Sequence, residues 1–523
     1  MKWEEVLNEF SKEFLKRREA EEEFDASKHS FYIHDPEMQY LSMLFTGYIN
    51  DFYYMSAREV FQLAYPLHRV ILDKDPEYHL MSLRVARAYG AMKDQVLIGL
   101  LLWSKHPERE KHKDELTELL ASFPPNQIVK KFINTKRKTP NLFGGLGIFE
   151  KKLLQNVIKT WEEQDKLPYY FAKYRHYIQQ LINLTHMKVN PAEFSYLSNP
   201  TRYEGNTDYL KQISEFLRTK DISNLPDRAP FELVRSSVPK ENWSVEVLEK
   251  CDITGNTVVL QACSLYSVFG DEILPYIKRA VSSPTVTADK ILKALVMASD
   301  KYDNLTEALA QAYAEKVKET YKQLLLPLPE MPRICMVIDA SGSMNPGTLG
   351  GMFLKAIACT APFAPLVKKL ILFSDNANYE DEKLLSSYDG LMKLLRTAVC
   401  RYDSGTDIVA GLKLALEQAK TGEINTVILA TDEQANILKG EETEMDLIRK
   451  LLNMDIRVIV LNPTPYPVHV SDIREKRLIY IPTPNPEAVT GALRLIQVRK
   501  ELQEAGAREL IQKLAVIRKK KKE

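Results

Sequence analysis

The spacing of apolar residues divides this chain into a long helical part and a shorter part in which strands and helices alternate. From residue 31 to about 325, apolar residues recur three and four positions apart, as in HLMSLRVARAYGAM and KKLLQNVIKTW, which is the period of an amphipathic helix. Breaks at Pro or Gly separate the successive segments. Because no fixed-period motif recurs, the pattern predicts an irregular stack of HEAT-like α-helical repeats that curves into a ring or an open horseshoe.

A proline-rich linker at residues 326–333 separates the two parts. After it, ICMVIDASGSM places a short apolar run before Asp339, and ILFSD, TVILATDEQ and IRVIVLN repeat the pattern. An apolar run that ends in small polar residues is typical of a buried parallel strand that opens into a loop. Strands alternating with helices therefore predict an α/β domain over residues 334–500. A charged helix at residues 1–30 and a helix with a basic tail at residues 501–523 complete the expected organisation.

Oxygen-bearing side chains follow the ends of these predicted strands. Asp339, Ser341 and Ser343 form D-x-S-x-S, Thr406 lies in a Gly-containing loop before a helix, and Asp432 follows a second strand. Carboxylate and hydroxyl oxygens are the hard ligands that Mg²⁺ prefers, and Mn²⁺ or Ca²⁺ is a further candidate ion. The alternative is that these residues serve only as helix N-caps, which also favour Asp, Ser and Thr.

These five residues together resemble the metal-ion-dependent adhesion site of the von Willebrand factor A family. The resemblance implies a six-element, doubly wound, Rossmann-like domain. It also implies that Asp339, Ser341 and Ser343 hold the ion directly, while Thr406 and Asp432 do so directly or through water. The remaining coordination position would be open to a partner's carboxylate or filled by water.

A second candidate region is the basic segment between residues 128 and 188. It holds 12 Lys and Arg residues against 4 acidic ones, whereas the whole chain has 71 basic and 70 acidic residues and a net charge of +1. Basic side chains bind phosphates, and the interleaved Tyr and His residues can stack on unpaired bases. The alternative is a solvated helix face with the tyrosines and His186 packed in the core. The candidate RNA contacts are Lys136, Arg137, Lys138, Lys151, Lys152, Lys159, Lys173, Arg175, His176, His186 and Lys188.

Within this segment, GIFEKKLLQNVIKTW, AKYR and LINLTHMK resemble consecutive helices of the TROVE domain, the RNA-binding half of the Ro autoantigen family. Ro proteins join that helical-repeat domain to a C-terminal von Willebrand A domain, and the order here is the same. The resemblance, which assigns residues 31–325 to the TROVE-like domain, implies a ring whose ends the A domain joins. It further implies that small noncoding Y-like RNAs bind the basic outer surface and that the hole takes single-stranded 3′ ends of misfolded RNAs.

The segment matches the family at some positions and departs from it at others. Lys173 and His186 match the family's RNA contacts. Tyr177 stands where the family usually has a further basic residue, and the connection from this helix to the helix containing His186 is shorter. These departures concern specificity for Y-like RNA more than general RNA binding.

Other function classes receive less support from the sequence. No G-x-x-x-x-G-K loop, H-E-x-x-H pair or serine nucleophile elbow occurs, so we expect no enzymatic activity. The alternative to RNA quality control within a ribonucleoprotein is a metal-dependent scaffold whose A domain binds the carboxylate of a protein partner. An exoribonuclease is a further candidate partner of the A domain.

The composition of the chain indicates where the protein acts and which partners it has. Five cysteines without C-x-x-C spacing favour reduced thiols in a cytoplasmic protein. No apolar run approaches the ~18 residues of a membrane span, and the acidic amphipathic start does not resemble a signal peptide. We therefore expect a cytoplasmic monomer that binds RNA, with neither a membrane nor DNA as a partner.

Overall fold

The computed structural model describes most of the chain. The described residues are 36–46, 57–90, 92–138, 143–283, 285–299, 301–324, 331–344, 352–399, 405–432, 442–463, 478–481, 488–493, 495, 511–512 and 515. The predicted helix at residues 1–30 lies outside them, as do most of the linker and most of the C-terminal segment.

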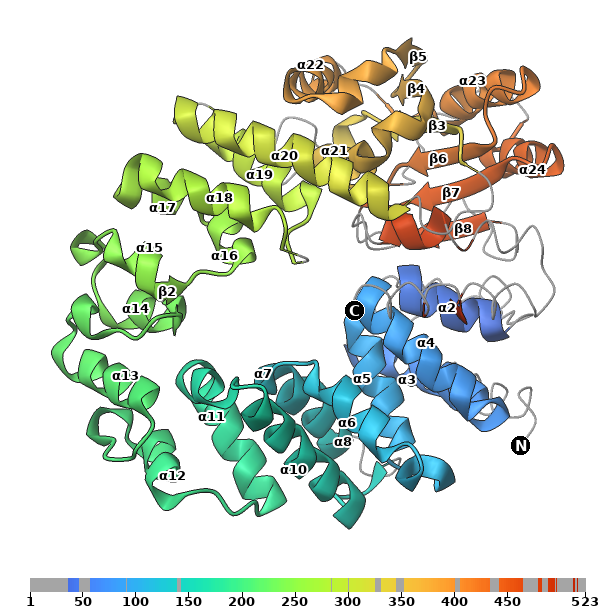
Figure 1. Ribbon diagram of the computed structural model, residues 1–523. Coiled ribbons are helices and arrows are strands. Elements are labelled where there is room, and N and C mark those ends of the chain that lie inside the picture. Colours follow the sequence, from blue (N-terminus) through green and yellow to red (C-terminus); the bar gives the residue numbers. More distant parts are fainter. Residues whose placement is uncertain are drawn as a thin grey trace. The chain divides into compact units, whose positions relative to one another are not determined.

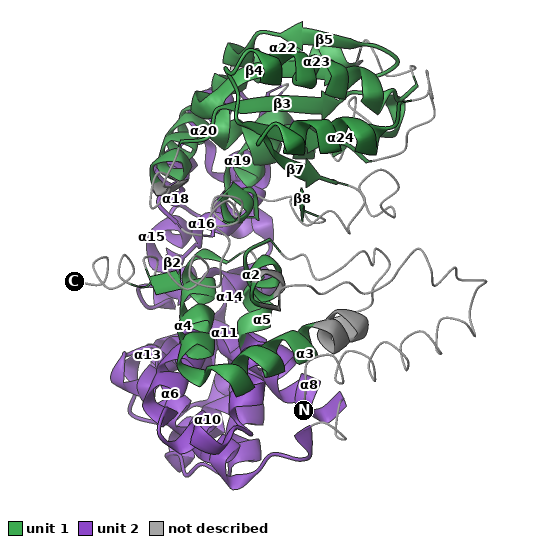
Figure 2. Ribbon diagram, turned by 90° about the vertical axis from the view of Figure 1, so that its right-hand side faces the viewer, with its two compact units in different colours: residues 1–96, 287–296, 310–523 green, residues 97–286, 297–309 purple. Residues whose placement is uncertain are grey.

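The chain divides into two compact units, coloured separately in Figure 2. Unit 1 comprises residues 1–96, 287–296 and 310–523, and unit 2 comprises residues 97–286 and 297–309. Residues 36–96 at the start of the helical part and residues 310–324 at its end belong to the same unit as the sheet.

Unit 1 contains a six-stranded sheet with the order β5-β4-β3-β6-β7-β8. All neighbouring strands are parallel except β4 and β5, which are antiparallel. Consecutive strands β3 and β4 lie side by side, but the chain then returns to place β6 on the other side of β3, which makes β3 the point where the strand order reverses. The strands are β3 (Ile334–Asp339), β4 (Val367–Phe373), β5 (Ala377–Glu380), β6 (Thr426–Ala430), β7 (Arg457–Leu461) and β8 (Leu478–Ile481).

Both faces of this sheet are covered, as the continuous apolar strands predict. Val337 and Leu429 point to the face on which α23 (Ile408–Lys420) and α24 (Glu444–Asn453) pack. Gly411 lets α23 approach closely, because an added Cβ would lie 3.0 Å from a methyl group of Val337. Met336 on the opposite face is also fully buried, and α21 (Met352–Thr360) packs against β3. The sheet is therefore doubly wound, with its core on both sides (Figure 1).

Helices from both ends of the helical part belong to unit 1. Phe45 in α2 meets the helical segment 488–493, where a Cβ added to Gly491 would lie 2.6 Å from the carbonyl oxygen of Phe45. Tyr313 in α20 lies near Cys359 in α21, and burial together with that thiol raises the pKa of Tyr313. The helices of unit 1, some of which continue into unit 2, are α2 (Pro36–Thr46), α3 (Ala57–Lys74), α4 (Pro76–Tyr89), α5 (Lys93–Trp103), α19 (Ala288–Ala298), α20 (Asp303–Leu324), α21, α22 (Tyr388–Val399), α23 and α24.

Unit 2 is built of short helices, with one small parallel sheet formed by β1 (Ala229–Pro230) and β2 (Cys251–Asp252). Its buried faces follow the amphipathic spacing of the sequence; in α10, for example, Leu153, Val157 and Trp161 are buried four residues apart. The helices are α6 (Lys113–Ala121), α7 (Pro125–Gln127), η2 (Ile128–Ile133), α8 (Asn134–Lys138), α10 (Ile148–Glu163), α11 (Leu167–Thr185), α12 (Pro191–Ser198), α13 (Asp208–Thr219), α14 (Phe231–Ser237), α15 (Glu246–Lys250), α16 (Gly255–Leu260), α17 (Ala262–Phe269) and α18 (Leu274–Ala280).

Two buried histidines connect the first helices of unit 1. His68 Nδ1 of α3 lies 3.0 Å from His79 Nε2 of α4, and both side chains are fully buried. Tyr40 of α2 meets the His68 ring edge-on and stacks on the His79 ring, with centroid distances of 5.3 and 5.5 Å. Burial lowers the pKa of His68 to about 3, although a hydrogen bond with Gln95 acts in the opposite direction.

Acidification should therefore loosen α3 and α4. An unfolded chain binds a proton at His68 near its ordinary pKa of about 6.5, whereas the folded chain resists protonation down to about pH 3. The stability that depends on this pair is complete above about pH 6.5 and declines as the pH falls, by up to about 1.4 kcal/mol per pH unit for one proton. Hydrogen exchange, corrected for its intrinsic pH dependence, should report more frequent opening of α3 and α4 in acid.

A variant and a matched control can identify the source of this effect. His68→Gln cannot take up a charge and should flatten the acid response of α3 and α4. His176→Gln removes an exposed histidine of unit 2 and should leave the response unchanged. Equal acid responses in the wild type and in His68→Gln would show that the buried pair is not responsible.

Candidate functional site

The first candidate site lies where β3 and β6 end. Asp339 is the last residue of β3 and is fully buried. Its Oδ1 accepts a hydrogen bond from the Ser341 backbone N–H at 2.9 Å, and its Oδ2 accepts one from Thr431 Oγ1 at 2.8 Å. Asp432, the residue after Thr431, is fully buried as well. Two carboxylates are thus held at the carboxyl ends of neighbouring parallel strands, beside the point where the strand order reverses.

Two hydroxyl-bearing segments adjoin these carboxylates. Ser341 and Ser343 share a hydrogen bond of 3.1 Å between their Oγ atoms, and Ser343 is exposed whereas Ser341 is buried. The segment containing Thr406 is anchored to the end of β4, because the Asp407 N–H donates to the Ser374 carbonyl oxygen at 2.6 Å. Thr406 itself is 2% exposed.

The two buried carboxylates repel one another. Burial, and then the neighbouring Asp432, raise the pKa of Asp339 to about 7, although the hydrogen bonds from Ser341 and Thr431 act to lower it. A cation bound here would relieve both effects, because it would compensate the negative charge that the interior cannot solvate. The donors are carboxylate and hydroxyl oxygens, so the residues fit a hard divalent ion.

The second candidate region, the basic segment, contains a buried ion pair. Lys136 of α8 binds Glu150 of α10, and both side chains are 2% exposed. Lys105 Nζ lies 3.0 Å from the same carboxylate oxygen, while the Gly147 N–H donates to the other oxygen at 2.9 Å. Burial alone would raise the pKa of Glu150, but the hydrogen bonds from Lys136 and Lys105 lower it to about 2. Lys136 therefore connects α8 to α10, a placement that differs from the exposed RNA contact expected from the sequence.

Lys173 is also engaged within the protein. Its ammonium lies 3.1 Å from Glu232 Oε1 and donates a hydrogen bond to the Tyr169 hydroxyl at 3.1 Å, and its side chain is 11% exposed. The same ammonium lies over the rings of Tyr169 and Tyr174. Backbone angles leave the helical range at Tyr174, where α11 is kinked. Lys173 thus stabilises the kinked part of α11 and has little surface to offer a ligand.

Most other predicted contacts reach the solvent. His186 ends α11 in a left-handed conformation with φ of 53°, and it is exposed rather than packed in the core. Lys151 and Arg175 are half-buried, and Arg175 lies 3.5 Å from a ring nitrogen of His176. The exposed members of the set are Arg137, Lys138, Lys152, Lys159, His176, His186 and Lys188.

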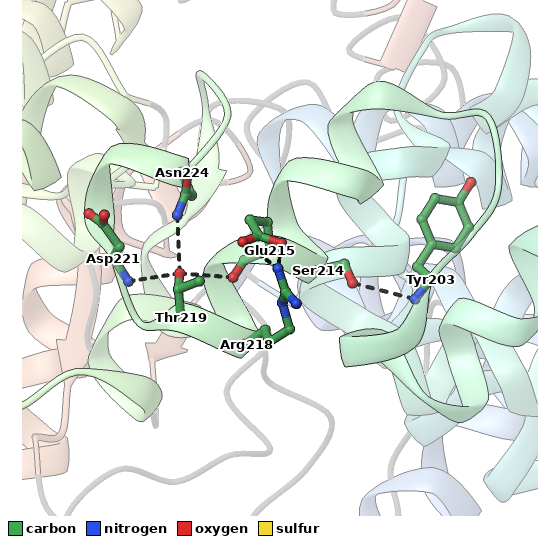
Figure 3. A network of polar contacts seen from close by, with 7 residues as sticks. All are labelled: Tyr203, Ser214, Glu215, Arg218, Thr219, Asp221 and Asn224. Carbon is green, nitrogen blue, oxygen red and sulfur yellow. Dashed lines mark hydrogen bonds and ion pairs between the residues drawn. The ribbon is translucent and has the colours of Figure 1, made fainter.

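A cavity in unit 2 offers no comparable chemistry. It has a volume of about 560 Å³ and lies between α13 and the segment that follows it. Two of its charged wall residues are paired: Glu215 binds Arg218 at 2.7 Å, and Lys211 lies 3.4 Å from Asp208. Figure 3 shows how the Thr219 hydroxyl closes the end of α13 by accepting hydrogen bonds from its neighbours. We interpret this region as structural.

The fold, rather than the sequence, relates this chain to a known protein. No protein-family model and no curated protein sequence matches it. The solved Ro (RSR) protein of Deinococcus radiodurans is similar over 88% of this chain and 99% of its own length, with a TM-score of 0.58 and 15% sequence identity. The chain has the Ro fold. The resemblance inferred from the sequence motifs is thereby confirmed for the fold.

Within this Ro fold, the residues of the expected metal site come from β3, β6 and the segment before α23, all in unit 1. Sequence reasoning missed Thr431, which orients Asp339, although its position directly before Asp432 was a usable signal. It also missed Glu150 as the partner of Lys136, since residues 14 positions apart on different helices carry no pairing signal.

Loss of the Glu150 carboxylate should destabilise unit 2. Glu150→Gln would leave Lys136 as a buried cation with a neutral partner, and breaking a buried ion pair in this way typically costs about 3 kcal/mol or more. Urea unfolding can be followed by the fluorescence of Trp103 and Trp161, which are both buried in unit 2. Glu162→Gln, an exposed change on the same helix, should alter stability by less than about 0.5 kcal/mol. Equal stability of the two variants would refute a structural role for the pair.

Proposed function

We propose that this protein is a Ro-like RNA-binding protein. It binds small noncoding, Y-like RNA and the single-stranded 3′ ends of misfolded RNA, and it acts as a non-enzymatic component of a ribonucleoprotein in RNA quality control. The observation that carries the proposal is the set of exposed basic side chains on α8, α10 and the end of α11. These residues lie in the segment whose sequence resembles a TROVE domain, and the chain has the Ro fold.

We also propose a shape, a cellular location and a protein partner for this RNA-binding protein. The helical part would curve into a ring or horseshoe of HEAT-like repeats, and the protein would act as a cytoplasmic monomer. Among the described residues, no helix has both the length and the apolar character of a membrane span. An exoribonuclease or another protein would bind through the A domain.

We further propose that Asp339, Ser341, Ser343, Thr406 and Asp432 bind one divalent ion, with Mg²⁺ favoured by the chemistry of the donors. The raised pKa of Asp339 supports this assignment, because an ion would compensate the charge of two buried carboxylates. Mn²⁺ and Ca²⁺ share the preference for oxygen ligands. When bound, the ion would supply a positive charge that can take an oxygen ligand from outside the chain.

An ion that can take an oxygen ligand from outside the chain favours a second candidate function, a metal-dependent scaffold that binds other proteins. Ser343 is exposed while the other four residues are buried, so the proposed ion site would open to the surface on the side of this serine. A partner carboxylate could then complete the coordination. RNA binding and this scaffold role depend on different residues and can be tested separately.

Reversing two exposed charges should weaken RNA binding. Lys152 and Lys159 are exposed, seven residues apart on α10, and therefore lie on similar sides of the helix. The double variant Lys152→Glu and Lys159→Glu should lower RNA affinity at least roughly tenfold at about 50 mM salt. It should also make the affinity less dependent on salt, because each phosphate contact to a single strand contributes about −0.7 to the slope of log affinity against log salt concentration. Fluorescence anisotropy with a hairpin RNA bearing a single-stranded 3′ tail measures both quantities.

The control uses the same spacing and charge in unit 1. Lys413 and Lys420 are exposed, seven residues apart on α23, and reversing them should leave RNA affinity unchanged within about twofold. Blunt duplex RNA should compete less well than the tailed hairpin. Equal losses in the two double variants would point to non-specific charge effects, and a wild-type protein that binds neither RNA would reject the proposed function.

Mg²⁺ should stabilise the wild-type protein through Asp339. At a concentration of about 100 times the dissociation constant, binding to the folded state alone adds about 2.7 kcal/mol. Asp339→Asn should abolish this stabilisation, because the ion loses a negatively charged ligand at the end of β3. Asp375→Asn changes an exposed carboxylate two residues beyond the end of β4 and should keep it. An unchanged Mg²⁺-dependent thermal shift in Asp339→Asn would refute the assignment.

A further inference from the structure

A π-helical turn lies at the start of the basic segment. Residues Ile128–Ile133 form this turn, called η2, between α7 and α8. Ile128, Val129, Phe132 and Ile133 are buried, whereas Lys130 is exposed. A π turn shifts the direction of the side chains that follow it, and such turns are frequent at functional positions. Both α7 and η2 pack against α11, so η2 can present its side chains to that helix.

Lys130 is directed at an aromatic ring of α11. Its ammonium lies 5.5 Å from the centroid of the Tyr177 ring, within the range of a cation–π contact. Tyr177 is half-buried and follows Arg175 and His176 on α11. The ring therefore restrains the flexible Lys130 side chain against α11.

Lys130 differs from Lys136 and Lys173, because it has no carboxylate partner in the described part of the chain. Lys136 and Lys173 each bind a carboxylate, but among the described residues no carboxylate lies within ion-pair distance of Lys130. The contact with the aromatic ring does not neutralise the ammonium. The ring also offers no lone pair, so the three N–H groups of Lys130 can still donate hydrogen bonds to a ligand. A cation that is oriented but not neutralised is suited to receive an anion.

We propose that Lys130 binds an RNA phosphate and that Tyr177 is the residue that positions it. This inference rests on the proposed RNA-binding function and identifies a contact for it. The anion belongs to RNA rather than to an acidic protein because exposed basic residues continue along α8 and α10, which suits a ligand that carries regularly spaced phosphates. Tyr177 acts through Lys130, since fixing the ammonium beforehand reduces the side-chain entropy lost on binding.

The test compares two neighbouring lysines. Lys131 lies in the same turn and is also exposed, but adjacent residues of a helix do not share a face. In the full-length protein, Lys130→Met should weaken binding of the tailed hairpin RNA roughly five- to tenfold at about 50 mM salt and reduce the steepness of the salt slope by about 0.7. Lys131→Met should change affinity less than about twofold and leave the slope unchanged.

Two changes at Tyr177 separate positioning from packing. Tyr177→Phe keeps an aromatic face and should retain wild-type affinity, whereas Tyr177→Leu should weaken binding about as much as Lys130→Met. Combining Tyr177→Leu with Lys130→Met should add little, because both act on one contact. Circular dichroism and urea unfolding should be the same for all four single variants.

The outcomes distinguish this inference from the proposed function. If the wild type binds RNA and Lys130→Met behaves as Lys131→Met does, the Lys130 contact is refuted while RNA binding stands. If Lys130→Met weakens binding but Tyr177→Leu does not, the positioning role of Tyr177 is refuted. A wild-type protein that binds no RNA overturns both the proposed function and this inference, and a carboxylate-rich partner bound through Lys130 in its place would overturn the choice of ligand.

Discussion

The burial of a carboxylate at the end of a central parallel strand is the constraint around which unit 1 is arranged. Every residue of β3, from Ile334 to Asp339, is buried, so the last side chain of the strand must satisfy its charge within the protein. The Ser341 N–H and the Thr431 hydroxyl do so in part. The nearby Asp432 adds to the problem, and the pKa of Asp339 rises to about 7 as a result. The cation that we propose for this site would compensate the charge of both carboxylates.

The lysines of the basic segment in unit 2 differ in how far their positive charge is compensated by the protein. Lys136 is buried and paired, and so contributes to the fold. Lys173 is mostly buried and is held by Glu232 and two tyrosines at the kink of α11. Lys130 and the exposed lysines of α10 retain their charge at the surface. Lys130 and the exposed lysines of α10 can therefore attract a phosphate, whereas Lys136 and Lys173 would first have to break their ion pairs.

The sequence predicted the elements that carry continuous apolar runs. The runs before Asp339, Asp375 and Asp432 correspond to β3, β4 and β6, because strands buried on both faces need apolar side chains throughout. Strand β5 was missed, since ANYE is polar and lies at the edge of the sheet, where its side chains are not buried. Burial of Lys136 could not be foreseen, because three successive basic residues do not reveal which one points inward. The pairing of Lys173 with Glu232 likewise joins positions far apart in the chain.

Photo-crosslinking of the full-length protein to the tailed hairpin RNA tests most directly whether RNA binds the exposed basic residues of unit 2. Mass spectrometry of the crosslinked peptides locates the contacts without altering any residue. We expect crosslinks in peptides that contain η2, α8, α10 and the end of α11. Crosslinks confined to α22, α23 and α24 of unit 1, or none above the level seen at high salt, would contradict this expectation.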